Sequence, residues 1–81
     1  MAKVLTLVSR SYCHLCHEME ESLYSLLGEF GVDLEVIDID ADTELLLRFD
    51  ELVPVLLHEG RELCHYHLDV AKVRDYLNEI R

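Results

Sequence analysis

The sequence predicts an α/β domain built on a four-stranded mixed sheet with helices packed on both faces. Three observations favour this class. Short runs of β-branched and apolar residues alternate with segments in which apolar residues recur every three or four positions. About 20 residues separate the first two strand-like runs, which fits a right-handed parallel crossover through a helix. A Glu-Gly pair later in the chain joins two more runs as a hairpin.

The first half of the chain predicts a strand, a helix and a second strand. Residues 3–9 are apolar and β-branched without a helical stripe, which indicates a buried strand. A helix follows, and Gly31 is a better C-terminal cap for it than Gly28. Residues 32–39 alternate at first and then become apolar, as expected for a second strand. The apolar stripe of the helix consists of Cys16, Met19, Leu23, Leu26, Leu27 and Phe30.

The second half predicts a short helix, a hairpin and a last helix. Asp42 or Thr43 caps the short helix, which covers residues 43–52. Residues 53–67 form the hairpin, with the Glu-Gly pair at its turn.

The last helix begins after Asp69, which caps it. Its apolar stripe consists of Val70, Val73, Leu77 and Ile80. The element order is therefore βαβαββα, and we expect one domain over residues 1–81.

The composition excludes several functional classes. Apolar residues make up 51% of the chain, too many for intrinsic disorder. Against 17 acidic residues there are 7 basic ones, and the net charge of −10 argues against nucleic acid and anionic membranes as partners. No apolar run approaches the roughly 20 residues of a membrane span, and the start lacks the features of a signal peptide. An odd, small number of cysteines does not suggest a secreted disulfide scaffold, whereas a C-x-x-C pair without an export signal points to redox or metal chemistry in a reducing cytosol. We expect a cytoplasmic protein and a monomer.

Cys13 and Cys16 form a C-x-x-C pair at the step from the first strand to the first helix. Unpaired backbone N–H groups at a helix N-terminus favour the thiolate of Cys13. Cys16 lies one turn deeper, where its sulfur can reach that of Cys13. Arg10, His14 and His17 are near in sequence, and any of them that is cationic and close favours the thiolate further. We therefore predict a thiol–disulfide oxidoreductase in which Cys13 attacks a disulfide and Cys16 resolves the mixed disulfide.

Two other interpretations of the cysteine pair stay open. The cysteines can be small core side chains, although their polar neighbours fit a core poorly. The main alternative is a metal-binding or partner-docking module with weak or no redox turnover. A second ligand pair with firm spacing is absent from the sequence. Zinc ligands would come from Cys13, Cys16 and His17, together with Cys64, His65 or His67.

The remaining cysteine, two histidines and three aspartates are interpreted as structural rather than catalytic residues. We interpret Cys64 as a half-buried thiol of the hairpin. His65 and His67 are expected on a solvated strand face, opposite to Cys64 if the strand is regular. The three aspartates of residues 38–42 have the spacing of a calcium loop but lack its Gly and distal Glu, so we assign them to caps and turns.

The Val53-Pro54 step precedes the hairpin and comes close to the end of the first strand in this topology. Two interpretations of it are possible, and the residues alone favour the first. Pro54 can open a strand and have no role in a site. A cis peptide bond would instead turn the backbone of Val53 toward Cys13, where it would pair with an extended peptide or a thiol.

The element order, the C-x-x-C pair and the Val-Pro step before a Gly-turn hairpin together resemble the glutaredoxin branch of the thioredoxin fold. The D-I-D-x-D stretch at residues 38–42 is similar to that of short glutaredoxin-like bacterial proteins of unassigned substrate. The resemblance covers nearly the whole chain. It implies that Cys13 is the attacking cysteine and Cys16 the resolving one, and that Pro54 is cis next to Val53.

The resemblance also assigns roles to residues around the cysteines. It implies that Arg10 contacts a glutathione carboxylate and that Tyr12 lines the substrate groove. His14 stands where the family has proline, and a protonated His14 would make the disulfide more oxidising. Residues 64–67 are bulky where the family has a Gly-Gly-x-Asp stretch that helps to hold glutathione. We expect no tightly bound cofactor, glutathione as a co-substrate, and a disulfide-containing protein or a small thiol as the partner.

Overall fold

The computed structural model of the protein describes residues 3–80. Its elements follow the predicted order, with an additional 3-10 turn before the second α-helix. No helix within the described residues is long and apolar enough to cross a membrane. The elements are β1 (Val4–Ser9), α1 (His14–Phe30), β2 (Asp33–Asp38), η1 (Ile39–Ala41), α2 (Thr43–Phe49), β3 (Val55–His58), β4 (Arg61–His65) and α3 (Val70–Ile80).

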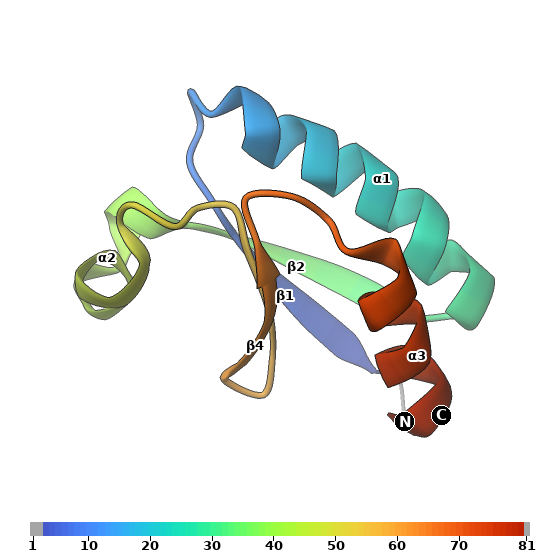
Figure 1. The fold of residues 1–81 in the computed structure, drawn as a ribbon. Helices are drawn as coiled ribbons and strands as arrows, with labels where there is room; N and C mark the ends of the chain where they lie inside the picture. The colour runs from blue at the N-terminus through green and yellow to red at the C-terminus, as the bar shows by residue number, and fades with distance from the viewer. Residues whose placement is uncertain (1–2, 81) are drawn as a thin grey trace.

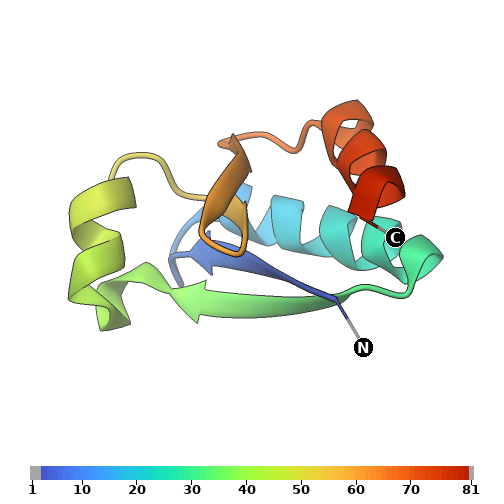
Figure 2. The same cartoon turned by 90° about the horizontal axis from the view of Figure 1, so that it is seen from below.

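The four strands form one mixed sheet in the order β2-β1-β3-β4. β1 and β2 are parallel, as the crossover predicted, with Val8 beside Ile37. β3 runs antiparallel to both β1 and β4. The C-terminal ends of β1 and β2 therefore lie at one end of the sheet, and α2 lies beside that end (Figure 2). The loop that contains Cys13 leaves the sheet from the same end.

Alternation along the strands places apolar side chains on both faces of the sheet. Leu7 and Leu56 belong to a cluster shared with α1 and α3, which lie together on one side of the sheet (Figure 1). Val8 and Val55 belong to a second cluster, which includes Phe49 of α2. Helices therefore pack on both faces, and the predicted fold class is confirmed.

α1 begins and ends where the sequence indicated. Cys13 occupies the N-cap, and Gly31 occupies the C-cap with a φ of 66°. This left-handed conformation suits glycine, which has no Cβ atom to clash with the backbone. Phe30 is half-buried, and the rest of the predicted stripe is buried. The buried residues are Cys16, Met19, Leu23, Leu26 and Leu27.

The hairpin turn and the cap of α3 also match the prediction. Glu59 and Gly60 have φ values of 51° and 81°, as the two central residues of a type I′ turn do. The side chain of Asp69 accepts a hydrogen bond from the backbone N–H of Lys72 (3.1 Å) and so caps the start of α3.

The hairpin contains a β-bulge that the alternation pattern did not indicate. Leu56 pairs with Cys64, whereas the next residue, Leu57, pairs with Glu62. Leu63 is therefore an extra residue in β4, opposite no residue of its own. Because the bulge interrupts the alternation, Leu63 and Cys64 are both buried in the cluster beneath α1 and α3.

The stripe of α3 differs from the prediction at one position. Val73 and Leu77 are buried and Ile80 is half-buried, but Val70 is 45% exposed. The expectation that Val70 faces the core was wrong. Leu68, in the loop before the helix, packs against the core instead, so the buried stripe begins one turn into α3.

Candidate functional site

Cys13 and Cys16 lie at the N-terminus of α1, and a disulfide joins their sulfur atoms. Their Cα atoms are 5.2 Å apart, which is within the ordinary range for bridged cysteines. The Sγ atom of Cys13 accepts a hydrogen bond from the backbone N–H of Cys16 (3.2 Å). Cys16 is fully buried, whereas Cys13 is half-buried. Of the two cysteines, Cys13 is therefore the one with surface open to an approaching molecule.

The peptide bond between Val53 and Pro54 is cis, as the resemblance implied. Pro54 is fully buried, and Val53 belongs to the same apolar cluster as the two cysteines. β3 begins directly after Pro54 and pairs with β1, which brings this step to the end of β1. The structure thus places the Val53-Pro54 step next to Cys13 and Cys16, although it lies far from them in the sequence.

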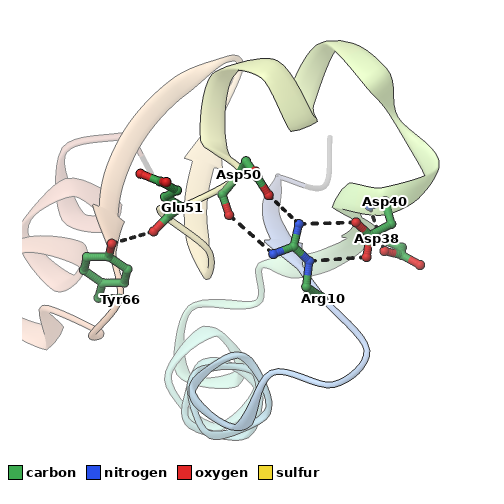
Figure 3. Close-up of polar contacts among 6 residues, drawn as sticks. All are labelled: Arg10, Asp38, Asp40, Asp50, Glu51 and Tyr66. Atoms are coloured by element: carbon green, nitrogen blue, oxygen red, sulfur yellow. Dashed lines mark hydrogen bonds and ion pairs between the residues drawn. The ribbon is translucent and has the colours of Figure 1, made fainter.

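Arg10 is held by two carboxylates of the protein itself (Figure 3). Its Nη2 donates a hydrogen bond to Asp50 Oδ1 (2.6 Å), and its Nε and Nη2 donate to the two carboxylate oxygens of Asp40 (3.3 and 3.2 Å). The side chain is only 16% exposed. Hydrogen bonds with Asp50 and Asp40 raise the pKa of Arg10 above its ordinary value, so the guanidinium stays charged. Arg10 therefore connects the Cys13 loop to η1 and to the C-terminus of α2.

Tyr12 and His14 flank Cys13 and face the solvent. Tyr12 is 78% exposed, and the guanidinium carbon of Arg10 lies 5.6 Å from the centre of its ring. His14 is the first residue of α1, and its Nε2 lies 3.1 Å from the carboxylate of Glu18, one turn further along the helix. Both side chains are exposed and are adjacent to Cys13 in the chain. The roles assigned to them toward a substrate stay predictions.

The ligands considered for a zinc site do not come together. Cys64 is buried in the other apolar cluster, and this burial raises the pKa of its thiol. The His65 ring pairs with Glu62 (2.9 Å), and the His17 ring contacts the carbonyl oxygen of Ser11 (3.0 Å). Within the part of the chain that the structure describes, no three His, Cys, Asp or Glu side chains are grouped so as to hold a metal ion. This arrangement disfavours the metal-binding alternative.

The aspartates between β2 and α2 have the capping roles that the sequence predicted. Asp38 accepts a hydrogen bond from the N–H of Asp40 (2.9 Å), and Asp42 accepts one from the N–H of Leu45 (3.1 Å). Asp40 also binds Arg10, which is a contact that local spacing does not reveal.

Tyr66 is a residue of this region whose role the sequence does not indicate. It has a φ of 64°, and its hydroxyl donates a hydrogen bond to the carbonyl oxygen of Glu51 (2.5 Å; Figure 3). Its N–H donates to the carbonyl oxygen of Pro54 (2.9 Å). His65 and His67 are both exposed. Because β4 ends at His65, the two residues do not lie on the face of one regular strand. For Tyr66, the available signal was its place in the bulky stretch at residues 64–67, where the resembled family has Gly-Gly-x-Asp.

Comparisons with known proteins identify relatives over nearly the whole chain. The family described as "Glutaredoxin-like domain (DUF836)" matches residues 4–78. Uncharacterized proteins of Mycobacterium bovis and Mycobacterium tuberculosis are 32% identical over 73 residues, which are 84% of this chain and 75% of theirs.

Solved structures share the fold. The solution structure of a Nitrosomonas europaea protein has a TM-score of 0.82 and 40% identity over 94% of this chain and 92% of that one. An X. campestris protein solved by X-ray crystallography has a TM-score of 0.73 and 33% identity over 93% and 96% of the two chains. Thioredoxin 1 from Thermosipho africanus, 18% identical with a TM-score of 0.66 over 95% and 97%, supports the fold alone. The predicted thioredoxin-like fold is therefore confirmed.

Proposed function

We propose that this chain, which belongs to the Glutaredoxin-like domain (DUF836) family, is a thiol–disulfide oxidoreductase that works through Cys13 and Cys16. The position of Cys13 carries the proposal. This residue caps α1, is joined to Cys16, and lies beside the Val53-Pro54 step. Backbone N–H groups at a helix N-terminus stabilise negative charge on sulfur, and the N–H of Cys16 already donates to Cys13 Sγ. The accessible sulfur would therefore attack, and the buried one would resolve.

The proposed reaction transfers two electrons from the protein to a disulfide. In the reduced form, the Cys13 thiolate attacks one sulfur of the substrate disulfide, whose S–S bond breaks, and the first substrate thiol leaves with a proton. Cys16 then loses its proton and attacks the Cys13 sulfur, which releases the second substrate thiol. The protein ends with the Cys13–Cys16 disulfide. Two molecules of glutathione, or one dithiol of a reductase, would return it to the dithiol form.

We propose a cytoplasmic disulfide-containing protein or a small disulfide as the substrate, since disulfides in that compartment are mostly transient and catalytic. The backbone of Val53, which precedes β3, would align an extended substrate beside Cys13. Glutathione meets an obstacle at this site. Arg10 already binds Asp40 and Asp50, so a glutathione carboxylate would have to displace or share one of these partners. The net charge of −10 would also repel this anion.

Three cysteine variants test the proposal. We expect Cys13→Ser to abolish the reduction of a peptide disulfide, because the attacking sulfur is gone. Cys16→Ser should accumulate a mixed disulfide on Cys13, which intact-protein mass spectrometry detects as added substrate mass. Cys64→Ala is the matched control and should keep the parental rate, since Cys64 lies in the other apolar cluster. Parental rates in both Cys13→Ser and Cys16→Ser would contradict the proposal.

A module that docks partners or binds metal without turnover makes a different prediction. Its cysteines would resist alkylation, and a metal ion would remain bound after purification. Iodoacetamide labelling of the reduced chain, followed for each cysteine as the pH is varied, separates the two functions. The proposed oxidoreductase requires that Cys13 be labelled at a lower pH than Cys64.

A further inference from the structure

Tyr66 has an unusual backbone conformation at the end of β4. Its φ of 64° lies in the left-handed region, where a bulky residue is an outlier. Such conformations persist only where surrounding interactions hold them, and they are frequent at functional sites. The interactions of Tyr66 therefore indicate what the unfavourable conformation supports.

Tyr66 makes two hydrogen bonds to the segment that carries the cis peptide. This segment, residues 50–54, connects α2 to β3. The Tyr66 hydroxyl donates to the carbonyl oxygen of Glu51 (2.5 Å), and the Tyr66 N–H donates to that of Pro54 (2.9 Å). Because both acceptors are backbone oxygens, these bonds fix the path of the segment rather than one of its side chains.

Arg10 holds the same segment at Asp50. Its Nη2 binds the Asp50 carboxylate (2.6 Å), and its Nη1 donates to the Asp50 carbonyl oxygen (3.5 Å). Figure 3 shows Asp50 and Glu51 between Arg10 and Tyr66. The carbonyl oxygen of Arg10 also accepts a hydrogen bond from the N–H of Cys13 (3.1 Å). Arg10 therefore links the position of the 50–54 segment directly to that of the attacking cysteine.

We propose that Tyr66 and Arg10 are positioning residues that hold the 50–54 segment in register with Cys13, so that an extended peptide disulfide can lie along Val53. The inference rests on the proposed function and adds a substrate class to it. An extended peptide needs the Val53 backbone in a fixed place, and ordering a loose loop costs binding free energy. A small disulfide needs only access to the Cys13 sulfur. Loosening the segment should therefore impair reduction of peptides selectively.

Two substrates that release the same thiol separate these cases. One is an unstructured peptide whose single cysteine carries 2-mercaptoethanol as a mixed disulfide, and the other is bis(2-hydroxyethyl) disulfide. In each, the reduced pair gives two electrons to the S–S bond, two thiols form, and dithiothreitol regenerates the dithiol. Tyr66→Phe removes only the hydroxyl. We expect kcat/KM for the peptide to fall about three- to tenfold, through KM, with the small disulfide unchanged.

Matched variants separate positioning from general damage. Tyr24→Phe alters an exposed tyrosine on α1 and should leave kcat/KM unchanged for both substrates. Tyr66→Gly accepts the left-handed φ without a side-chain clash but lacks the hydroxyl. Its free energy of unfolding in urea should therefore be at least as high as that of Tyr66→Phe. Its kcat/KM for the peptide should fall by the same factor.

Arg10, the second positioning residue, has its own pair of variants. Arg10→Lys keeps the charge but loses the planar fork that binds Asp40 and Asp50 together, and it should raise KM for the peptide by a larger factor than for the small disulfide. Arg74→Lys is its control, because Arg74 makes a comparable two-bond ion pair with Glu29 away from the site.

The outcomes distinguish the inference from the function beneath it. If the parent reduces both substrates and the Tyr66 and Arg10 variants match it on the peptide, the positioning role is wrong and the oxidoreductase stands. Equal losses on both substrates would also overturn it, because they would mean a general effect on Cys13. If the parent reduces neither substrate, the proposed function fails and the inference fails with it.

Discussion

The face of the sheet covered by α1 and α3 and the end that carries the cysteine pair are held together differently. On the covered face, Leu23 of α1 and Leu77 of α3 are buried in a cluster of hydrophobic side chains. At the cysteine end, Arg10 and Tyr66 hold irregular backbone through ion pairs and hydrogen bonds. Apolar packing depends on filled volume, whereas hydrogen bonds fix the positions of particular atoms. The free energy of unfolding therefore depends most on the buried apolar residues, whereas the geometry of the site depends on Arg10 and Tyr66.

The largest expected effect is on the covered face. Leu23 is fully buried, so Leu23→Ala removes buried methyl groups and leaves a cavity. We expect it to lower the free energy of unfolding by about 2–5 kcal/mol, measured by urea denaturation. Leu47→Ala, at an 83% exposed position of α2, is the control and should change the value by less than about 0.5 kcal/mol. A similar small change in both variants would remove the distinction between the two regions.

The two ion-paired arginines sharpen the comparison. Arg74 joins α3 to Glu29 of α1, and both partners are about half exposed, so Arg74→Ala should cost at most about 1 kcal/mol. Arg10→Ala should cost more, because it leaves Asp40 and Asp50 near each other without their shared cation. Urea denaturation at low and high salt measures the free energy of unfolding of both variants. High salt should reduce the destabilisation in Arg10→Ala, because it screens the two carboxylates from each other. A smaller loss for Arg10→Ala than for Arg74→Ala would contradict this reasoning.

Cys64 provides a pH-dependent probe of the covered face. Its burial raises the pKa of the thiol, so the folded chain holds this proton more tightly than the unfolded chain does. The resulting stabilisation is complete below the ordinary thiol value of 9.0 and is lost as the pH rises through the folded value. With Cys13 and Cys16 oxidised, unfolding free energies of the parent should fall in this alkaline range. In Cys64→Ala, the free energy of unfolding should fall less steeply with pH. The same slope in both proteins would contradict a raised pKa for the Cys64 thiol.

The smallest expected effect distinguishes Glu59 from Tyr66, the two non-glycine residues with a positive φ between residues 3 and 80. Glu59 occupies a type I′ turn position that asparagine adopts more readily. Glu59→Asn should therefore raise the free energy of unfolding by a few tenths of a kcal/mol without any change in peptide reduction. Tyr66→Asn, in contrast, should impair peptide reduction, because the hydroxyl bonded to Glu51 is lost. Urea denaturation and the kinetics of peptide reduction measure the difference between the two variants. A lower free energy of unfolding in Glu59→Asn than in the parent would contradict the prediction.

Much of the fold could be predicted because helices and turns depend on neighbouring residues. The stripe from Cys16 to Leu27 shares one face of α1 through the helical period, and Gly31 ends the helix through its own backbone freedom. The prediction was wrong at Val70, and the bulge at Leu63 was not anticipated. Both features depend on where a neighbouring element ends and on the space that remains beneath it, which periodicity does not describe.

The candidate site shows the same division. The sequence by itself determined that Cys13 and Cys16 lie one turn apart at the start of a helix, because three residues of local chain set that distance. Only the tertiary structure decided that Arg10 meets Asp40 and Asp50, which lie 30 and 40 residues away along the chain. With 17 acidic residues available, local spacing carries no information about which carboxylates meet the guanidinium. Pairing of β1 with β2 and β3 makes that selection, because it brings distant chain segments to one end of the sheet.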